Sequence, residues 1–145
     1  MIGPNVVIRN GVKVQNNISI YEGVEIEDDV FLGPSVVFTN VSNPRSFIMR
    51  KEEFKKKTLL QKKYSIGANS TIFCGNNKGA YGFVGTGTLV IGDVPDYALT
   101  IRNTSRQIGL ISKSGNMLKF DRDGVAFYSA TNEEHLLINN TVSKK

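Results

Sequence analysis

The sequence predicts an all-β protein built as a parallel β-helix, in which short strands coil around one shared core. Two observations carry this prediction. Apolar residues recur with a period of six between Ile2 and Phe38, which fits neither a helix, at 3.6 residues, nor a plain strand, at 2. Gly, Asn and Asp, which tolerate the positive φ of tight turns, stand between them. The apolar positions are Ile2, Ile8, Val14, Ile20, Ile26, Leu32 and Phe38, and Val6, Val12, Ile18, Val24, Val30 and Val36.

Each six-residue unit is interpreted as one short strand and one turn, and three units complete a triangular coil. Because successive side chains of a strand point to opposite faces, alternate residues enter the interior, and stacked coils bury columns of Ile and Val. A β-sandwich of short strands is the alternative, but it predicts irregularly spaced turn residues. The constant spacing of six therefore favours the β-helix.

Length and composition bound the remaining possibilities. With 145 residues the chain is expected to form one domain with a small appendage. It has neither an apolar run long enough to span a membrane nor a signal-like start, which favours a cytoplasmic protein. A single cysteine, Cys74, excludes an internal disulfide and a cysteine zinc site, and it is expected to be a small buried side chain.

A basic stretch, Val41–Tyr64, interrupts the repeat after Phe38-Thr39-Asn40 and holds much of the net charge of +5. It is expected to leave the β-helix as a loop excursion, with the repeat resuming at Ile66. Long ordered loops on rigid repeats are usually functional. Its cations are Arg45, Arg50, Lys51, Lys55, Lys56, Lys57, Lys62 and Lys63. These cations would bind a phosphate-bearing small molecule or nucleic acid, or would only keep a solvated loop soluble. The aromatic residues of the stretch are too few for a base-stacking platform, which argues against nucleic acid.

The second half of the repeat is less regular. Lys78 stands where an inward aliphatic residue is expected, so one disturbed turn is predicted inside a fourth coil. The repeat recovers from Val84 to Val90. Pro95 is then expected to end it, because proline cannot donate to a strand ladder, and Tyr97–Ile101 is predicted to form a strand returning along the stack.

The remaining residues, 112–145, are predicted to form a small β appendage beside a β-helix domain at 1–111. Met117–Phe120 and Val125–Tyr128 flank the turn-forming Asp121–Gly124, a hairpin pattern. Asn132–Lys145 is expected to be one more strand or a frayed tail. The appendage is predicted to cover the last coil, since a bare β-helix end exposes strand edges. The single histidine, His135, is expected on the surface without a ligand.

Several strings carry a family resemblance that covers roughly Val14 to Gly109. They are QNNISIYEGVEIEDDVFLGPSVVFTNVSNPR, followed by the basic loop, IGANSTIFCG, GDVPDYAL and SRQIG. The chain resembles hexapeptide-repeat N-acetyltransferases that acetylate the 3-amino group of nucleotide-linked sugars. In particular it is similar to enzymes acting on UDP-2-acetamido-3-amino-2,3-dideoxyglucuronate in the synthesis of surface glycans such as lipopolysaccharide and O-antigen.

The resemblance implies a left-handed β-helix, a homotrimer with active sites at subunit interfaces, and acetyl-CoA as the donor. It implies a catalytic role for Asn40 in positioning the reacting groups, and no role for a metal, a membrane or nucleic acid. It also implies two sets of binding residues. The nucleotide sugar would contact Gln15, Asn16, Asn17, Tyr21, Glu22 and Arg45, and the coenzyme would contact Ala68, Thr86, Gly87 and Arg106.

The chemistry of the residues agrees with an amine acceptor. Acyl transfer to a hydroxyl needs a general base, commonly histidine, and the repeat contains none. A neutral amine attacks without one and passes its proton to the departing thiolate, so positioning and oxyanion stabilisation suffice. The same absence argues against a β-helix carbonic anhydrase, whose zinc needs three histidines.

Other interpretations stay open at this point. Asn40, Asn16 and Asn17 also suit turns, and Tyr21 and Glu22 suit a solvated face. CGNNKG replaces the expected CGVTIG, and Arg102-Asn103-Thr104-Ser105 replaces Gly-Asn-Pro-Ala. Both changes fall on the coenzyme side. The alternative function is therefore a non-catalytic relative that binds a nucleotide sugar or a protein partner, with a coenzyme groove spoiled by Lys78 and the altered loop.

Overall fold

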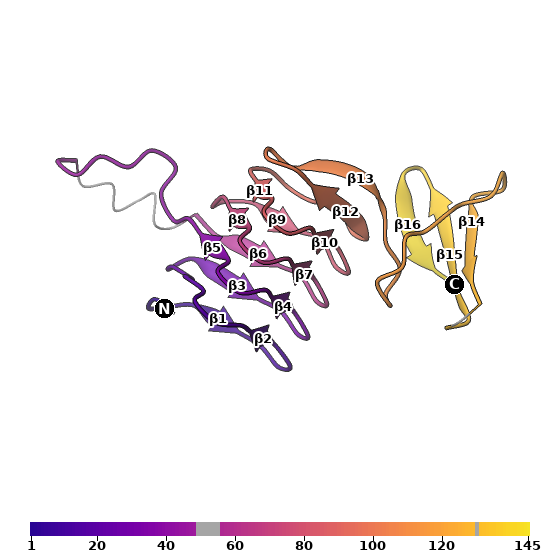
Figure 1. The fold of residues 1–145 in the computed structure, drawn as a ribbon, viewed down its shortest axis with the longest axis horizontal. Helices are drawn as coiled ribbons and strands as arrows, with labels where there is room; N and C mark the ends of the chain where they lie inside the picture. The colour runs from indigo at the N-terminus through magenta and orange to yellow at the C-terminus, as the bar shows by residue number, and fades with distance from the viewer. Residues whose placement is uncertain (49–55, 130) are drawn as a thin grey trace.

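The computed structural model describes residues 1–48, 56–129 and 131–145, and its regular elements within these ranges are all β-strands. Figure 1 shows stacked coils, an arm that projects from them and a separate C-terminal sheet. No helix in the described ranges is long and apolar enough to cross a membrane. The all-β prediction, with a protruding loop and a C-terminal β appendage, is confirmed.

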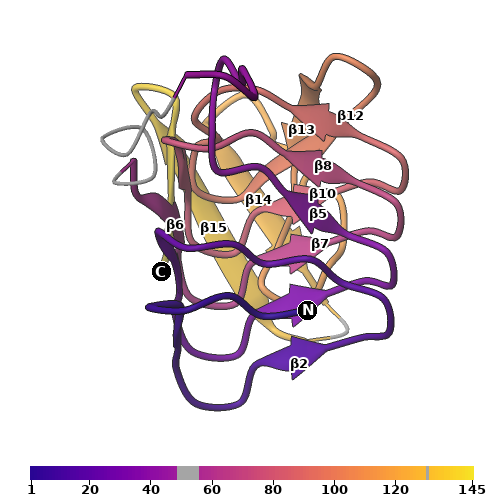
Figure 2. The same ribbon diagram turned by 90° about the vertical axis from the view of Figure 1, so that its left-hand side faces the viewer.

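Three walls of parallel strands form the β-helix, and the chain visits them in turn (Figure 2). The first wall contains β1 (Val7–Ile8), β3 (Val24–Ile26), β6 (Thr58–Leu60) and β9 (Asn77–Lys78). The second contains β2 (Lys13–Val14), β4 (Phe31–Leu32), β7 (Ser65–Ile66), β10 (Phe83–Val84) and β12 (Ala98–Ile101). The third contains β5 (Val37–Phe38), β8 (Thr71–Ile72) and β11 (Leu89–Val90).

The predicted apolar ladder lines the interior of this prism. Parallel pairing aligns Ile26 with Leu60 and Leu32 with Ile66, so each inward side chain rests on the one in the next coil. These side chains are fully buried. In the first coil, which has no coil beneath it here, Ile2 is 54% and Val14 39% exposed. Inward direction alone therefore does not bury a residue in the first coil, whereas the residues of the second coil, which pair with a coil on both sides, are fully buried.

The turns show why the repeat length is six. At most corners the third residue after the inward position has positive φ, as at Asn5, Gly11 and Asn17 in the first coil. Gly and Asn adopt this left-handed conformation at little cost. Lys63 and Tyr81 adopt it as well, with φ near 60°, in the later coils. These two turns thus keep the geometry where the sequence no longer signals it.

The later coils are more regular than the sequence predicts. The repeat resumes at Thr58, where β6 pairs with β3, rather than at Ile66. Lys78 produces no disturbed turn: it lies in β9, pairs in register with Leu60 and is fully buried in the interior column. A long aliphatic stem lets lysine take an inward position that Ile26 and Leu60 take in earlier coils.

Pro95 does not end the repeat, contrary to the prediction. Val94 bridges Lys78 in parallel, and β12 continues the second wall beside β10. The last coil therefore passes from Val90 to Val94 with two residues fewer than usual. The returning strand is β13 (Arg106–Leu110), which runs antiparallel to β12 at the end of the second wall.

The C-terminal appendage pairs differently from the predicted hairpin. Val125–Tyr128 forms β14, but its partner is β15 (Glu133–Ile138), which also pairs with β16 (Thr141–Lys144). Met117 makes only an isolated bridge to Ile111. Asn132–Lys145 thus supplies two strands of an antiparallel three-stranded sheet rather than one strand or a tail.

An aromatic cluster joins this sheet to the β-helix. Tyr97 stacks on Tyr81 at 5.0 Å between ring centroids, and His135 meets Tyr97 edge-on at 5.7 Å. The ammonium of Lys113 lies 4.6 Å from the Tyr81 centroid, within range of a cation–π interaction. His135 is fully buried in this contact, so the prediction of a surface histidine is wrong. Sequence showed a polar residue in a polar tail, whereas the fold packs it against Tyr97.

Candidate active site

Successive walls meet at three corners, which organise the functional residues. The arm corner joins the third wall to the first and contains, of the described residues, 21–23, 39–48, 56–57, 73–76 and 91–93. The groove corner joins the second wall to the third and contains residues 15–18, 33–36, 67–70 and 85–88. The appendage corner joins the first wall to the second and contains residues 9–12, 27–30, 61–64, 79–82 and 95–97.

The arm leaves the prism at Thr39, directly after β5, and returns at Thr58, the first residue of β6. Its described part extends well beyond the coils (Figure 1). Phe47, 82% exposed, lies on this projecting part, whereas Asn40 is half-buried at the exit. Asn40 thus lies where the third wall ends and the arm begins.

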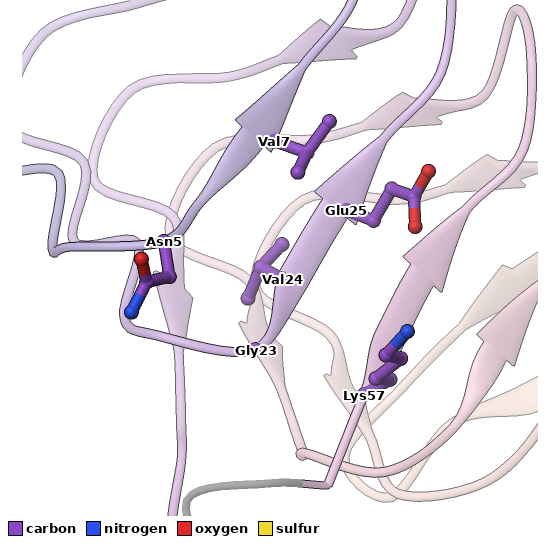
Figure 3. Close-up of a pocket in the computed structure, with 6 residues that line it drawn as sticks. All are labelled: Asn5, Val7, Gly23, Val24, Glu25 and Lys57. Atoms are coloured by element: carbon purple, nitrogen blue, oxygen red, sulfur yellow. The ribbon is translucent and has the colours of Figure 1, made fainter.

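A pocket lies beside the base of the arm, on the outer face of the first wall. Figure 3 shows the carboxylate of Glu25 and the ammonium of Lys57 on the same side of this wall. The pocket has a volume of about 170 Å³ and is lined by Asn5, Val7, Gly23, Val24, Glu25 and Lys57. Glu25 also forms a salt bridge of 2.8 Å with Arg9, an exposed pair of small energetic value. The ammonium of Lys57 has no acceptor among the described residues.

The groove corner brings successive turns unusually close together. A Cβ on Gly33 would lie 2.7 Å from the Ala68 nitrogen, and one on Gly67 would lie 2.6 Å from the Thr86 nitrogen. Glycine is therefore required at both positions. The backbone N–H groups of Ala68 and Thr86 find no acceptor within the described residues, although the neighbouring Gly67 and Gly87 donate to Val84 and Ala68. This corner thus presents a row of unpaired donors.

The predicted site residues divide between two corners. Asn40, Tyr21, Glu22 and Arg45 lie at the arm corner, with Tyr21 and Glu22 half-buried and Arg45 exposed on the arm. The remaining predicted residues lie at the groove corner, except for Arg106, which begins β13 just beyond it: Gln15, Asn16, Asn17, Ala68, Thr86 and Gly87. Within one chain the third wall separates these two sets.

The contacts of the predicted sugar-binding residues favour different roles. Glu22 accepts a hydrogen bond of 2.9 Å from the Asn5 side chain, so its carboxylate is held in place at the arm corner. Asn17 has φ of 59° and donates to Ser35 at 3.1 Å, as expected of a turn residue that links two coils. The turn interpretation therefore accounts for Asn17 without a ligand.

The basic stretch does not form one patch. Lys56 and Lys57 lie at the base of the arm, whereas Lys62 and Lys63 lie at the appendage corner. Lys63 approaches the Tyr81 ring there, at 5.9 Å. Arg50, Lys51 and Lys55 lie outside the described residues. Among the described residues, the cations of the arm and its base are Arg45, Lys56 and Lys57.

Lys78 lies away from the groove corner. Its ammonium donates to the Gly92 carbonyl at 2.6 Å, beneath the shortened turn of the arm corner. Burial lowers the pKa of Lys78 to about 8, and Asp93 opposes this shift. The side chain therefore does not obstruct the groove, and one of the two reasons for a spoiled coenzyme site is removed. Among the described residues, no group of three or more His, Cys, Asp or Glu is placed to hold a metal.

Sequence reasoning missed three residues at the base of the arm, namely Thr39, Thr58 and Lys57. Thr39 accepts a hydrogen bond from the Cys74 backbone, and Thr58 accepts one from the Gly75 backbone. A polar Thr58 in a register that holds Val6 and Val24 in earlier coils was the available signal. Lys57 was counted with the basic stretch, but its pocket depends on the fold.

Known proteins share both the repeat and the fold. Residues 5–40 match the bacterial transferase hexapeptide family model, described as six repeats. The chain is 48% identical over 64 residues to dTDP-3-amino-3,6-dideoxy-alpha-D-galactopyranose 3-N-acetyltransferase of Aneurinibacillus thermoaerophilus. That match covers 44% of this chain and 33% of the enzyme. It is also 28% identical over 98 residues to galactoside O-acetyltransferase of Lactococcus lactis subsp. lactis (strain IL1403). This second match covers 65% of this chain and 47% of that enzyme.

Among solved structures, a variant of GDP-perosamine N-acetyl transferase from Caulobacter crescentus, in complex with CoA and GDP-perosamine, has a TM-score of 0.61. The match covers 74% of this chain and 44% of that one at 17% identity, and so concerns the fold. The chain spans from a third to about half of the length of the curated relatives it matches. It is a left-handed β-helix that carries bacterial transferase hexapeptide repeats and resembles sugar N-acetyltransferases.

Proposed function

We propose that the chain transfers the acetyl group of acetyl-CoA to the 3-amino group of a nucleotide-linked amino sugar, in the synthesis of a surface glycan such as lipopolysaccharide. The observation that carries this proposal is the 48% identity over 64 residues to a dTDP-3-amino-sugar 3-N-acetyltransferase. The lack of a histidine in the β-helix supports an amine acceptor. The relative's match covers only part of each chain, so the whole reaction is proposed.

The groove corner offers the donor site. The unpaired N–H groups of Ala68 and Thr86 suit the amide carbonyls of pantetheine, since backbone donors in a rigid turn need no reorganisation. Gly87 adds no side chain to the same surface, so a ligand can approach the backbone there. Arg106, exposed beyond this corner, suits a phosphate at the far end of the coenzyme. The acetyl group would then point toward an acceptor at the arm.

The arm corner offers the acceptor site. Arg45 and Lys57 supply charge for the diphosphate of the nucleotide sugar, and Asn40 orients the amine and the acetyl carbonyl. The neutral amine attacks the thioester carbon, a C–N bond forms and the C–S bond breaks. The amine proton passes to the departing thiolate, so free CoA leaves. Tyr21, Glu22 and the residues Gln15 and Asn16 remain candidates for sugar contacts.

The division of the site between two corners supports a cyclic assembly. The arm corner of one copy would meet the groove corner of the next, as in the homotrimer that the family resemblance implies. Asn40 and Ala68 would then come from different copies. A cytoplasmic location, and a boundary between the β-helix at 1–111 and the appendage at 112–145, belong to the same proposal.

An acceptor panel tests the proposal. Purified protein is incubated with acetyl-CoA and UDP- or dTDP-linked 3-amino sugars, and thiol release is followed. Each amino sugar is matched by its 3-hydroxy counterpart, because a galactoside O-acetyltransferase is also a relative. We expect thiol release with at least one amino sugar and none with its hydroxyl analogue. Release with the hydroxyl sugar alone, or with neither, would contradict the proposal.

Substitution of Asn40 separates catalysis from folding. Asn40→Ala is expected to lower kcat about a hundredfold while the free energy of unfolding changes by less than about 1 kcal/mol, because the half-buried amide fills no core. Asn10→Ala, exposed at the appendage corner, is the matched control and should change neither quantity. Parallel losses of activity and stability in Asn40→Ala would restore the turn interpretation of this residue.

The second candidate is a non-catalytic protein that binds a nucleotide sugar. The altered Arg102–Ser105 loop beside the groove corner is the remaining observation that favours it. Thermal shift separates the two, because a ligand that binds the folded state raises the melting temperature. Stabilisation by coenzyme A supports the enzyme, whereas stabilisation by a nucleotide sugar alone supports the binder.

A further inference from the structure

The two ends of the arm are fixed to the walls by backbone hydrogen bonds. Thr39 continues the third wall, and its N–H donates to the Ile72 carbonyl at 2.9 Å. Thr58 begins the first wall, and its N–H donates to the Gly23 carbonyl at 2.8 Å. Asn40 follows Thr39 directly, so the direction of its backbone depends on how firmly Thr39 is held.

The side chains of the same two threonines make a second set of bonds. The Thr39 hydroxyl accepts from the Cys74 N–H, and the Thr58 hydroxyl accepts from the Gly75 N–H, each at 3.0 Å. The two donors are consecutive amides of one turn in the next coil. A single turn therefore fixes the separation of the two ends of the arm.

That turn is itself held in place. Gly75 adopts φ of 81°, which exposes consecutive N–H groups toward the coil below. The Asn76 side chain donates to the Cys74 carbonyl at 3.0 Å and to the Ile91 carbonyl at 3.1 Å, which links the turn to the coil above. On the outer side, the Lys56 ammonium donates to the Ser42 hydroxyl at 2.8 Å and closes the neck of the arm.

The interior residues of this corner change where the arm appears. The inward position at the start of the first wall is Val6 in the first coil and Val24 in the second. It becomes Thr58 in the coil that carries the arm and Asn76 in the next, although Thr58 is as buried as Val24. At this corner, polar side chains thus replace valine in the two coils that form and bond the turn beside the arm.

We propose that Thr39 and Thr58 are positioning residues that clamp the arm to the Cys74–Gly75 turn, and that Thr39 thereby sets the orientation of Asn40 toward the acceptor. The role of Asn40 rests on the proposed function, whereas the clamp itself does not. Thr39 touches no reacting atom. It acts through the backbone of the adjacent residue.

Two measurements on the full chain test this inference. The first is hydrogen exchange of individual backbone amides by NMR. Thr39→Val, which keeps the shape and removes the hydroxyl, is expected to speed exchange at Cys74 at least about tenfold, and Thr58→Val to do so at Gly75. Thr39→Ser retains the hydroxyl and should restore the wild-type rate. Unchanged exchange at Cys74 and Gly75 would overturn the clamp, whether or not the protein is an enzyme.

The second measurement is steady-state kinetics. Thr39→Val is expected to lower kcat about tenfold with KM for acetyl-CoA within about twofold, and Thr39→Ser to recover kcat. Thr100→Val is the matched control, because Thr100 is a buried threonine of the second wall that donates to Phe83. It should leave kcat unchanged. A Thr39→Val enzyme with wild-type kcat overturns the positioning role, whereas an inactive wild type overturns only the proposed function.

Discussion

The interior of the first two coils and the interior of the later three are filled by different types of side chain. In the first two, both inward registers are aliphatic, as at Val24 and Leu32. In the later coils the interior also contains buried polar residues. These are Thr58, Ser70, Lys78, Thr88 and Thr100.

Two of these polar residues occur where the coil geometry departs from the repeat. Thr58 bonds the turn beside the arm, and Lys78 bonds the turn shortened by two residues before Val94. Ser70 and Thr88 both donate to the Gly85 carbonyl at the groove corner. Buried backbone groups need partners, and these interior side chains supply them. The aliphatic coils therefore build the scaffold, and the polar coils adapt it to the arm and the groove.

The largest loss of stability is expected when a side chain of the aliphatic coils is truncated. Leu32→Ala removes a fully buried side chain stacked on Ile66 and should lower the free energy of unfolding by about 3 kcal/mol. Ser70→Ala, in the polar coils, should lower it by about 1 kcal/mol, the value of a buried hydrogen bond. Urea unfolding at one protein concentration measures both. Equal losses would remove the distinction between the two regions.

Substitution of Lys78 is expected to raise stability at neutral pH rather than lower it. Its folded pKa of about 8 lies below the ordinary 10.5, so between these values the unfolded chain retains a proton that the folded chain has released. Wild-type stability should therefore gain on the order of 2 kcal/mol between pH 7 and 9.5, relative to Lys78→Met. At pH 7 Lys78→Met should itself be more stable by roughly 1 kcal/mol, because no charge is buried.

The comparison between wild type and Lys78→Met cancels the titration of other groups. Chemical denaturation at several pH values is the measurement. A parallel pH dependence of the two proteins would show that the Lys78 ammonium is not desolvated in the folded state.

The smallest effect concerns the joint between the last coil and the C-terminal sheet. Burial lowers the pKa of His135 below 6.5; Glu133 opposes this shift, and Lys144 and Lys113 add to it. Within the described part of the chain, neither ring nitrogen has a hydrogen-bond partner. Because the unfolded chain takes up the proton first, stability should fall as the pH drops below 6.5.

His135→Phe keeps an aromatic ring against Tyr97 and removes the titrating group. It should reduce the loss of melting temperature between pH 7 and 5, measured by differential scanning calorimetry. His135 is the only histidine, so no other histidine contributes to the difference. An unchanged acid dependence in the variant would assign the transition to carboxylates instead.

The sequence predicts the regular part of this molecule and fails at its interruptions. The six-residue period identified the inward column from Ile2 to Phe38 because each position there is aliphatic. Lys78, Val94 and Thr100 also occupy inward positions. Lys78 and Thr100 were missed because they are polar, and Val94 because the shortened corner before it breaks the six-residue spacing. His135 was misplaced because its burial depends on a contact with Tyr97, distant in sequence.

The candidate site was predicted as a set of residues but not as an arrangement. Motifs identified Asn40 and Ala68, whereas their separation by the third wall follows only from the fold. Thr39 and Thr58 were missed because their hydroxyls bond backbone groups of another coil, which a local motif does not reveal.

The most direct test asks whether the arm corner and the groove corner of different copies form one site. Asn40→Ala disables the arm corner, and Thr86→Trp fills the groove corner at an exposed position. Each variant alone should retain about a hundredth of the wild-type activity or less. Equal mixing by co-expression should give about a quarter of wild-type activity, because that fraction of interfaces joins an intact arm corner to an intact groove corner. A mixture as inactive as its components would contradict the account, since both halves would then have to come from one chain.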